Sequence, residues 1–306
     1  MRKSLIGRTV GGFAMTDAAP RTTVTLLGTG VPHPAPGRAG AATLVRRGDV
    51  ALLFDAGRGA VLRLTEAGVR PFAVSAVLLT HVHSDHLVDL ADVAMTRWVE
   101  QQLHRTGPLP IVAVAGVAAR FVERMLEPYD VDIDLRREHT GADEPRVTLT
   151  TFAAPVEPTR VWTSADGAVL VDAVAVHHEP VPEAVAYRVT TPEGVVVISG
   201  DTRVCAEVEG FASGADVLVH EACRASAMAD RIRGTVFESI FSYHADTVAL
   251  GGLARRAGVH HLVLTHLIPA PADDRGEAEF AADVRAGGYE GRVTVGRDLF
   301  EVSLPG

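Results

Sequence analysis

Three histidines and one aspartate fall within six consecutive positions of this 306-residue chain, in the stretch "HVHSDH", residues 81–86. The stretch directly follows the apolar run "VSAVLLT", which is typical of a buried strand. On a strand, His81 and His83 point to the same side. Asp85 and His86 would then begin a helix, so that four donors converge at one strand end. Imidazoles and a carboxylate are ligands that suit zinc and leave a position open for water.

A six-residue motif cannot complete two metal sites, so further ligands must follow other strands. Four more apolar runs end in such side chains, which are Asp55 after "VALLF", His177 and His178 after "AVAV", Asp201 after "VVVISG" and His266 after "HLVLT". Each is weak evidence alone, because an aspartate after a strand is commonly a turn residue. Five strand ends that all carry metal-binding side chains indicate one shared centre.

The remaining pattern indicates which elements position these residues. Apolar, β-branched runs predict strands in both halves of the chain, and helical spacing predicts helices at 59–68, 85–99, 244–257 and 273–285. Such a pattern favours two sheets packed face to face, with helices outside. We expect residues 1–21 to be a flexible N-terminal tail, with Met15 as a second possible start, and 22–306 to be one domain. The stretch 129–168 is the least regular and is expected to be a surface excursion.

Composition narrows the class of protein. Cys205 and Cys223 are the only cysteines, so a disulfide scaffold is excluded and a cytoplasmic location is expected. No apolar run reaches the ~18 residues of a membrane-spanning helix, so no membrane partner is expected. The formal net charge is -9 and no basic stripe stands out. Nucleic acid is therefore a possible partner that composition does not favour.

With these residues in view, the chain resembles the metallo-β-lactamase superfamily. "HVHSDH" fits the family motif HxHxDH, and the likeness runs over about residues 22–303. Within the superfamily it is most similar to the ribonuclease Z and arylsulfatase-like branch, in "LLGTGVPHPAPGRAGAATLV", "LLFDAGRG", "VLVHEAC" and "LVLTHLIP". The resemblance implies an α/β fold, a four-layer αββα sandwich of two packed mixed β-sheets with helices outside.

The resemblance also implies two zinc ions, with iron or manganese as possible replacements. Its ligands carry over to one group of His81, His83 and His178 and another of Asp85, His86 and His266, bridged by Asp201. Asp55 would orient the histidine ligands. His178 is preferred over His177 because its spacing to Tyr187 suits the branch.

Two further motifs resemble functional positions of the branch. "HEAC" places Glu221, and "YHAD" places His244, where the family has an acid/base pair. Asp85 would be a second candidate catalytic residue, as a proton acceptor. Cys223 is expected to be a small buried residue.

Three functions fit these features. The first hypothesis is a dinuclear zinc-dependent hydrolase that uses a metal-bound hydroxide on small phosphodiester or sulfate-ester substrates. The second is a ribonuclease Z-like endonuclease that processes the 3′ end of transfer RNA. We rank it lower because the region from about 128 to His178 lacks the glycine-rich, basic arm expected of that enzyme. The third is a pathway-specific tailoring enzyme, a cyclase, lyase or thioesterase. The branch often dimerises, so a homodimer is a weak expectation.

Overall fold

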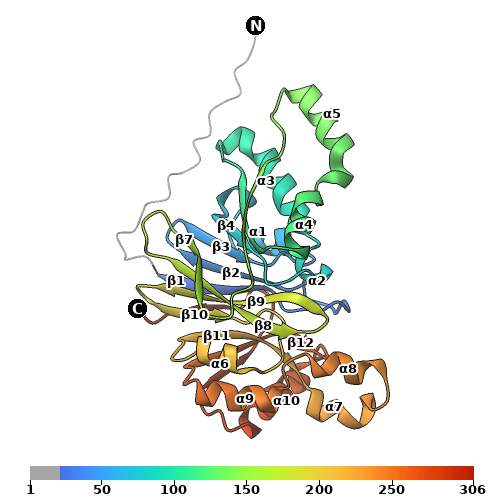
Figure 1. Ribbon diagram of the computed structural model, residues 1–306, viewed down its shortest axis with the longest axis vertical. Coiled ribbons are helices and arrows are strands. Elements are labelled where there is room, and N and C mark those ends of the chain that lie inside the picture. The colour runs from blue at the N-terminus through green and yellow to red at the C-terminus, as the bar shows by residue number, and fades with distance from the viewer. Residues whose placement is uncertain (1–20) are drawn as a thin grey trace.

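Fourteen strands form two seven-stranded sheets in the computed structural model, which describes residues 21–306 (Figure 1). The first sheet has the order β14-β1-β2-β3-β4-β5-β6. Its strands are β1 (Thr22–Gly28), β2 (Ala42–Arg47), β3 (Val50–Phe54), β4 (Ala76–Leu78), β5 (Leu109–Val114), β6 (Val147–Phe152) and β14 (Glu301–Ser303). The last strand of the chain therefore returns to pair with the first, so both ends of the domain meet in one sheet.

The second sheet has the order β13-β12-β11-β10-β9-β8-β7. Its strands are β7 (Thr159–Thr163), β8 (Leu170–His178), β9 (Val181–Thr191), β10 (Gly194–Ile198), β11 (Val217–Cys223), β12 (His261–Ile268) and β13 (Arg292–Val295). Parallel and antiparallel pairs occur in both sheets, so both are mixed, as the resemblance implies.

Helices cover the outer face of each sheet. Those over the first sheet are α1 (Ala60–Glu66), α3 (Leu90–His104) and α4 (Val117–Arg124), and those over the second are α6 (Ala206–Phe211), α9 (Thr247–Arg256) and α10 (Asp274–Ala286). The others are α2 (Ser84–Leu87), α5 (Asp130–Thr140), α7 (Ala225–Ile232), α8 (Val236–Ser242) and the 3-10 turns η1 (Pro71–Ala73) and η2 (Glu127–Tyr129). Among the described residues, no helix combines the length and apolarity needed to cross a membrane.

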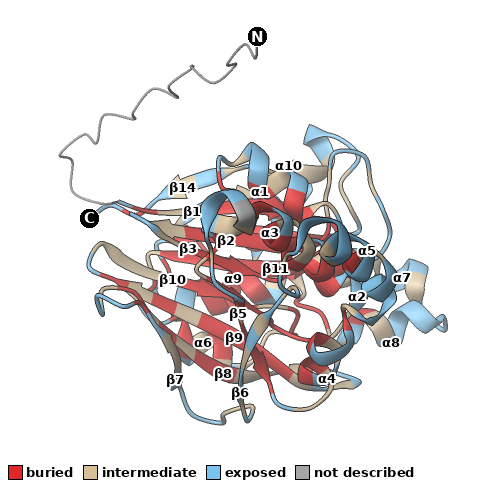
Figure 2. Cartoon of the chain, turned by 90° about the horizontal axis from the view of Figure 1, so that it is seen from above, coloured by how far each residue is buried: buried red, intermediate tan, exposed pale blue. Residues whose placement is uncertain are grey.

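Buried residues are concentrated in the strands and in the helix faces beside them (Figure 2). Their apolar side chains form three separate groups between the layers. Leu26, Phe54 and Val219 belong to the group that fills the space between the two sheets. Leu64 belongs to the group between the first sheet and its helices, and Leu253 to the group between the second sheet and its helices. Each such side chain contributes about 1.5–3 kcal/mol when it is fully buried. Three apolar groups separate four layers, which confirms the αββα sandwich.

Strand direction determines where the chemistry gathers. In the second sheet β10, β11 and β12 are mutually parallel, and β8 runs the same way because β9 is antiparallel to both β8 and β10. In the first sheet β3 and β4 are parallel. Side chains that follow parallel strands meet at one edge of a sheet, and ligand sites form outside such carboxyl ends. The polar residues that end these strands are therefore brought to one edge of the sandwich.

The two sheets touch closely at this edge. The Tyr187 hydroxyl, on β9, donates a hydrogen bond of 2.7 Å to the carbonyl of Leu79, just beyond β4. The Val185 amide donates to the Thr80 carbonyl at 3.0 Å. Gly200 has φ 59°, and a Cβ there would lie 2.7 Å from the Cβ of Thr80. Both the backbone conformation and the close approach thus require glycine at this position.

Two expected elements differ from the structure. The helix expected over 85–99 is divided into α2 and α3, because the Asp89 amide donates to the Ala56 carbonyl at 2.9 Å and its carboxylate accepts from the Gly59 amide at 2.8 Å. The irregular stretch 129–168 contains α5, β6 and β7, and α5 stands away from both sheets in Figure 1. The tail expected over 1–21 lies, except for Arg21, outside the described residues.

The Tyr187 hydrogen bond between the sheets can be tested by Tyr187→Phe. The residue is fully buried, so the change leaves the Leu79 carbonyl without this donor in an apolar layer. We expect the free energy of unfolding to fall by about 1–3 kcal/mol in chemical denaturation. The matched control is Tyr129→Phe, because Tyr129 is 41% exposed. Equal unfolding midpoints for both variants would contradict the role given to Tyr187.

Candidate metal centre

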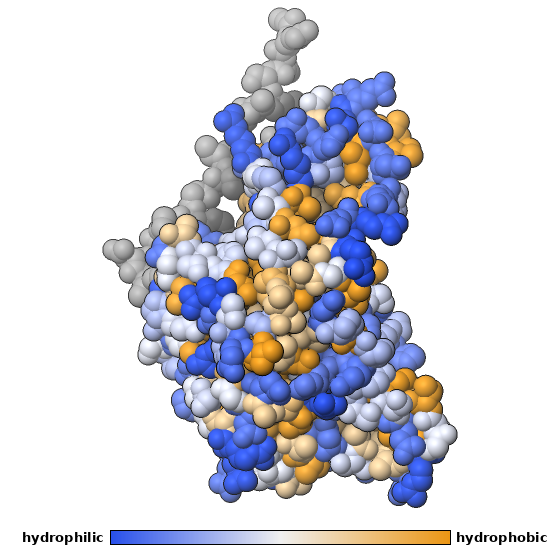
Figure 3. All heavy atoms as spheres, viewed as in Figure 1, coloured by the Kyte–Doolittle hydropathy of each residue, from blue (hydrophilic) through white to orange (hydrophobic). Residues whose placement is uncertain are grey.

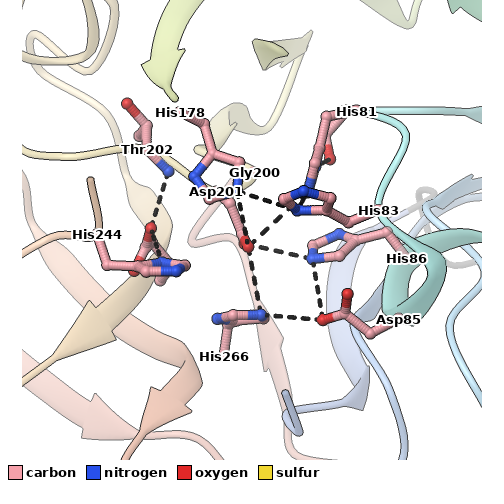
Figure 4. A network of polar contacts seen from close by, with 12 residues as sticks. His81, His83, Asp85, His86, His178, Gly200, Asp201, Thr202, His244 and His266 are labelled. Carbon is pink, nitrogen blue, oxygen red and sulfur yellow. Dashed lines mark hydrogen bonds and ion pairs between the residues drawn. The ribbon is translucent and has the colours of Figure 1, made fainter. Parts of the chain in front are cut away.

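The structure brings all seven expected ligands to the same edge of the sandwich (Figure 4). His81 and His83 follow β4, and His178 ends β8. The Nδ1 of His83 lies 3.1 Å from the Nε2 of His81 and 3.1 Å from the Nε2 of His178. His81 and His83 thus come from the first sheet and His178 from the second. Together these three side chains form the first donor group.

The second donor group contains Asp85, His86 and His266. Asp85 and His86 lie on α2, directly after the first group, and His266 lies on β12. The Oδ2 of Asp85 is 3.2 Å from the Nε2 of His266 and 3.7 Å from the Nε2 of His86. All three side chains are buried.

Asp201 lies between the two groups, as Figure 4 shows. Its Oδ2 is 3.9 Å from the Nε2 of His81 and 3.8 Å from the Nε2 of His178. The same oxygen is 3.3 Å from the Nε2 of His266, and Oδ1 is 3.3 Å from the Nε2 of His86. One buried carboxylate therefore faces imidazoles of both groups, which is the geometry that a bridging ligand needs.

Unusual backbone geometry orients the side chains of His266 and Asp55. His266 is the extra residue where the β11–β12 register shifts, since Glu221 pairs with Thr265 and Ala222 pairs with Leu267. Its φ is 44°, and that of Asp55 is 61°. Positive φ is uncommon outside glycine, and a bulge redirects a side chain relative to its strand. The bulge therefore turns His266 out of the regular alternation of β12 and into the site.

Buried acceptors fix the orientation of the histidine rings. Asp55 accepts from the Thr80 amide at 2.8 Å, from the Thr80 hydroxyl at 2.7 Å and from the Nδ1 of His86 at 2.7 Å. Because the Thr80 hydroxyl donates to Asp55, it accepts from the Nδ1 of His81 at 3.0 Å. The Tyr243 carbonyl lies 3.4 Å from the Nδ1 of His178. Each contact places the proton on Nδ1 and directs the Nε2 lone pair into the site.

Burial and the neighbouring carboxylates shift the pKa values of these imidazoles in opposite directions. Burial lowers the pKa of His81, His83 and His178, so these rings are neutral near pH 7. Burial opposes charge on His86 as well, but the carboxylates of Asp201 and Asp55 outweigh it and raise the pKa of His86 well above its usual value. Burial likewise works against the charge of Asp201, yet the surrounding histidines hold its pKa well below the usual range.

The residues present fit a pair of divalent cations. Within the described chain, the Nε2 of His86 and the Oδ1 of Asp201 are buried and make no hydrogen bond, although they lie 3.3 Å apart. Buried polar atoms are rarely left without a partner. Ring nitrogens that converge at 3.1 Å, as those of the first group do, repel unless a proton or cation lies between them. Nitrogen and carboxylate donors of this kind suit zinc, iron or manganese.

A second polar pair adjoins the donor groups. The Nδ1 of His244 is 2.8 Å from the Oε1 of Glu221, and the His244 ring stacks against that of His266 with centroids 5.6 Å apart. Burial would lower the pKa of His244, but the Glu221 carboxylate outweighs it and raises this pKa to about 9. His244 is therefore a protonated imidazole at neutral pH, held by a carboxylate beside the centre. This is the pair that the resemblance implied.

Two neighbouring residues lie outside the centre. The Nε2 of His177 is 3.2 Å from Glu207, and its side chain is 40% exposed. The structure therefore places His178, not His177, among the donors. Burial raises the pKa of the Cys223 thiol, which keeps it protonated, and the residue is buried as expected.

Asp55 was expected to orient the histidine rings, whereas three further residues that do so, or that hold Glu221, were not expected. Thr80 directly precedes the motif but has no feature that separates it from any strand-end threonine. Tyr243 acts through its main-chain carbonyl, which leaves no signal in the side-chain pattern. Thr202 donates its amide to Glu221 at 2.8 Å, again through the main chain.

The choice between adjacent histidines can be tested by metal content. We expect His178→Ala to lose metal, since it removes one of three nitrogens in the first donor group, whereas the matched variant His177→Ala should keep it. Inductively coupled plasma mass spectrometry after dialysis measures this directly. Metal loss in His177→Ala with full occupancy in His178→Ala would reverse the assignment.

The variant Asp55→Asn tests whether the hydrogen bonds of Asp55 are needed to orient the histidine ligands. All three groups that Asp55 binds are donors, so an amide NH₂ in place of one oxygen would face another donor. We expect metal affinity to fall by about 10–100-fold in a chelator competition assay. Asp49→Asn, in the exposed turn between β2 and β3, is the control and should bind metal as the wild type does. Unchanged affinity in Asp55→Asn would show that the rings need no such support.

Curated relatives extend over almost the whole chain. Ribonuclease Z of Mycobacterium bovis (strain BCG / Pasteur 1173P2) is 38% identical over 283 residues, which cover 92% of this chain and 98% of that protein. Ribonuclease Z of Mycobacterium sp. (strain KMS) is 39% identical over 286 residues, with 92% and 95% covered.

Solved structures share the fold. The metallo-β-lactamase fold protein YhfI of Bacillus subtilis gives a TM-score of 0.69 at 24% identity and covers 93% of this chain and 99% of its own. The short form of human tRNase Z gives a TM-score of 0.68 at 19% identity, with 92% and 99% covered. The family model of the metallo-beta-lactamase superfamily matches residues 35–226, more than half of the chain. Together with the fold and the donor groups, this match shows that the chain is a hydrolase of the metallo-β-lactamase superfamily.

Proposed function

We propose that this protein is an endonuclease of the ribonuclease Z type, which cleaves a phosphodiester bond at the 3′ end of precursor transfer RNA. The observation that carries the proposal is the match to proteins named Ribonuclease Z, at 38% identity over 92% of this chain and 98% of the relative. A likeness of that extent includes every strand end that carries a donor. It favours the transfer-RNA alternative over the small phosphodiester or sulfate ester that the sequence analysis placed first.

The two donor groups and Asp201 would hold a pair of divalent cations, most simply zinc. Such cations acidify water and neutralise charge on a phosphate, which is what hydrolysis of a phosphodiester requires. The chain supplies the rest of the centre. Asp55, Thr80 and the Tyr243 carbonyl hold the rings in one tautomer, so that the donor atoms are already arranged before substrate binds.

His244 would act as the general acid. Its Nδ1 proton is engaged by Glu221, so the proton on Nε2 is free to be donated to the departing oxygen of the substrate. Its pKa of about 9 keeps that proton in place at neutral pH. Burial works against the charge of Asp85, but His266, whose Nε2 lies 3.2 Å from its Oδ2, and His86 together lower the pKa of the carboxyl, so Asp85 stays ionised. The main role of Asp85 would then be that of a metal ligand, and proton transfer would be a lesser role.

Recognition of RNA would not use a glycine-rich, basic arm. The described residues between His178 and Asp201 hold only β9 and β10, and residues 129–168 hold α5, β6 and β7. Contacts to phosphate are strongly salt-dependent, and a chain of net charge -9 has few cations to spare for them. The assay is therefore best run at low ionic strength.

The test uses zinc-loaded protein and precursor transfer RNA with a 3′ trailer, beside bis-p-nitrophenyl phosphate and an aryl sulfate. We expect cleavage between the mature end and the trailer. His244→Ala should lower the turnover number by about 10²–10⁴ while metal content stays at the wild-type value, because it removes the acid but no ligand. The matched variant His177→Ala should cleave at the wild-type rate.

Other outcomes contradict the proposal in distinct ways. An intact precursor combined with rapid hydrolysis of a small ester would restore the first hypothesis. A fully metal-loaded protein that leaves all three substrates intact would favour a tailoring enzyme on the same centre.

A further inference from the structure

The ring of Tyr243 lies beside the metal centre but neither orients a ligand nor transfers a proton. Only the main-chain carbonyl of this residue acts on His178. The ring centroid lies 5.4 Å from that of His178 at an interplanar angle of 82°, and 5.4 Å from that of His244 at 44°. These separations are typical of aromatic pairs. In the described part of the chain, no other phenylalanine, tyrosine or tryptophan ring pairs with a donor histidine or with His244.

The Tyr243 ring is only partly covered. His178 and His244 are buried, whereas Tyr243 is half-buried. The two imidazoles therefore cover part of the ring, and the rest is accessible to solvent beside a ligand and beside the proton donor. A substrate that receives a proton from His244 must come within reach of this accessible ring. The position suits a residue that contacts substrate rather than one that only fills the core.

The backbone on both sides of Tyr243 holds the ring in place. Before it, Phe241 buries its side chain near the end of α8. After it, Glu221 binds the side chain of His244 and the amide of Ala245. A ring that is held before the substrate arrives loses little conformational freedom on binding. Tyr243 is thus a preformed flat surface.

A nucleobase is the group of an RNA substrate that fits this surface. His244 donates its proton to the departing oxygen, and the nucleotide that carries this oxygen has its base one sugar ring away. Bases stack on aromatic side chains whatever the sequence, because every base has a flat π face. Stacking needs no cation, unlike a contact to phosphate. It therefore suits a chain of net charge -9.

We infer that the ring of Tyr243 stacks on the nucleobase of the nucleotide that carries the departing oxygen. The contact adds affinity for a base of any type at this site. The inference rests on the proposed cleavage of RNA. It differs from a purely structural role of the ring, which would affect metal binding and every substrate alike.

Steady-state kinetics of Tyr243→Ala on precursor transfer RNA with a 3′ trailer test the contact. The substitution removes the ring but keeps the main-chain carbonyl that orients His178, so metal content should stay at the wild-type value. We expect KM to rise by about 5–150-fold, which corresponds to the loss of one stacked base. The turnover number should stay nearly unchanged, because the stack is present both before and during the reaction. Tyr243→Phe keeps the ring and should restore the wild-type KM.

Phe237→Ala is the matched control. Apolar spheres lie over α7 and α8 at the lower right of Figure 3, and Phe237 is 44% exposed on the same helix that leads to Tyr243. Its ring pairs with that of Phe241, with centroids 6.2 Å apart, rather than with a histidine of the centre. Its removal should therefore leave KM and the turnover number unchanged. Circular dichroism checks that each variant is folded.

A modified substrate gives a second readout that the wild type alone can provide. The precursor carries one abasic nucleotide on the departing side of the cleaved bond, which is the side whose fragment is released without the phosphate. We expect it to raise the wild-type KM by the same factor as Tyr243→Ala does. The two changes together should raise KM no further, because both remove the same contact. The increase should persist at higher ionic strength, unlike the loss of a phosphate contact.

The outcomes separate this inference from the proposed function. An unchanged KM in Tyr243→Ala, an abasic precursor with the natural KM, or loss of metal from Tyr243→Ala would each overturn the inference and leave the proposed function intact. A wild-type enzyme that leaves the natural precursor uncut would contradict the proposed function itself, and the stacked nucleobase with it.

Discussion

The buried carboxylate of Asp201 is the constraint on which the rest of the structure depends. It is 3% exposed and lies within 4 Å of the ring nitrogens of His81, His86, His178 and His266. Removing an ionised carboxylate from water costs several kcal/mol unless positive charge compensates it nearby. The polar groups that compensate Asp201 have to come from both sheets, because no single strand can surround one carboxylate. The sheets must therefore approach to contact at this edge, where Gly200 meets Thr80 and Tyr187 binds Leu79.

Backbone strain also occurs at this edge of the sandwich. Four described residues other than glycine have positive φ, and Asp55 and His266 are two of them. Such conformations cost about 1–3 kcal/mol each and persist only where the surroundings determine them. Asp55 is held by its amide bond to the Leu78 carbonyl at 3.0 Å and by three donors on its carboxylate. His266 is held between β11 and β12. Strained backbone and unpaired polar atoms therefore occur together at this edge. Both cost folding free energy, and both result from the convergence of the donor side chains.

The sequence was informative where residue type and strand direction act together. The strand ends at which the donor side chains gather could be found from the pattern, because polar residues at the ends of apolar runs meet at one sheet edge once the strands are parallel. The choice of seven ligands among them, and the four-layer order, came from the family resemblance. Thr80 and the Tyr243 carbonyl could not be predicted, since a hydroxyl or a main-chain oxygen gains its role only from the tertiary contact. Helix α5 was missed because its apolar residues are few and almost none is buried. The substrate ranking relied on the missing arm, and the relatives named Ribonuclease Z support the alternative that it placed second.

Glu221 links His244 to the two donor groups. One of its oxygens accepts from the Thr202 amide, next to Asp201, and from the Nδ1 of His244, while the other accepts from the Ala245 amide at 3.2 Å. One carboxylate therefore holds both the loop after β10 and the two residues His244 and Ala245 that follow α8. Because Glu221 binds both His244 and the residue next to Asp201, a shift of either loop would move both of these side chains. The position of His244 relative to the donor groups is thus set by a single buried side chain, which explains why a charged residue lies in the buried strand β11.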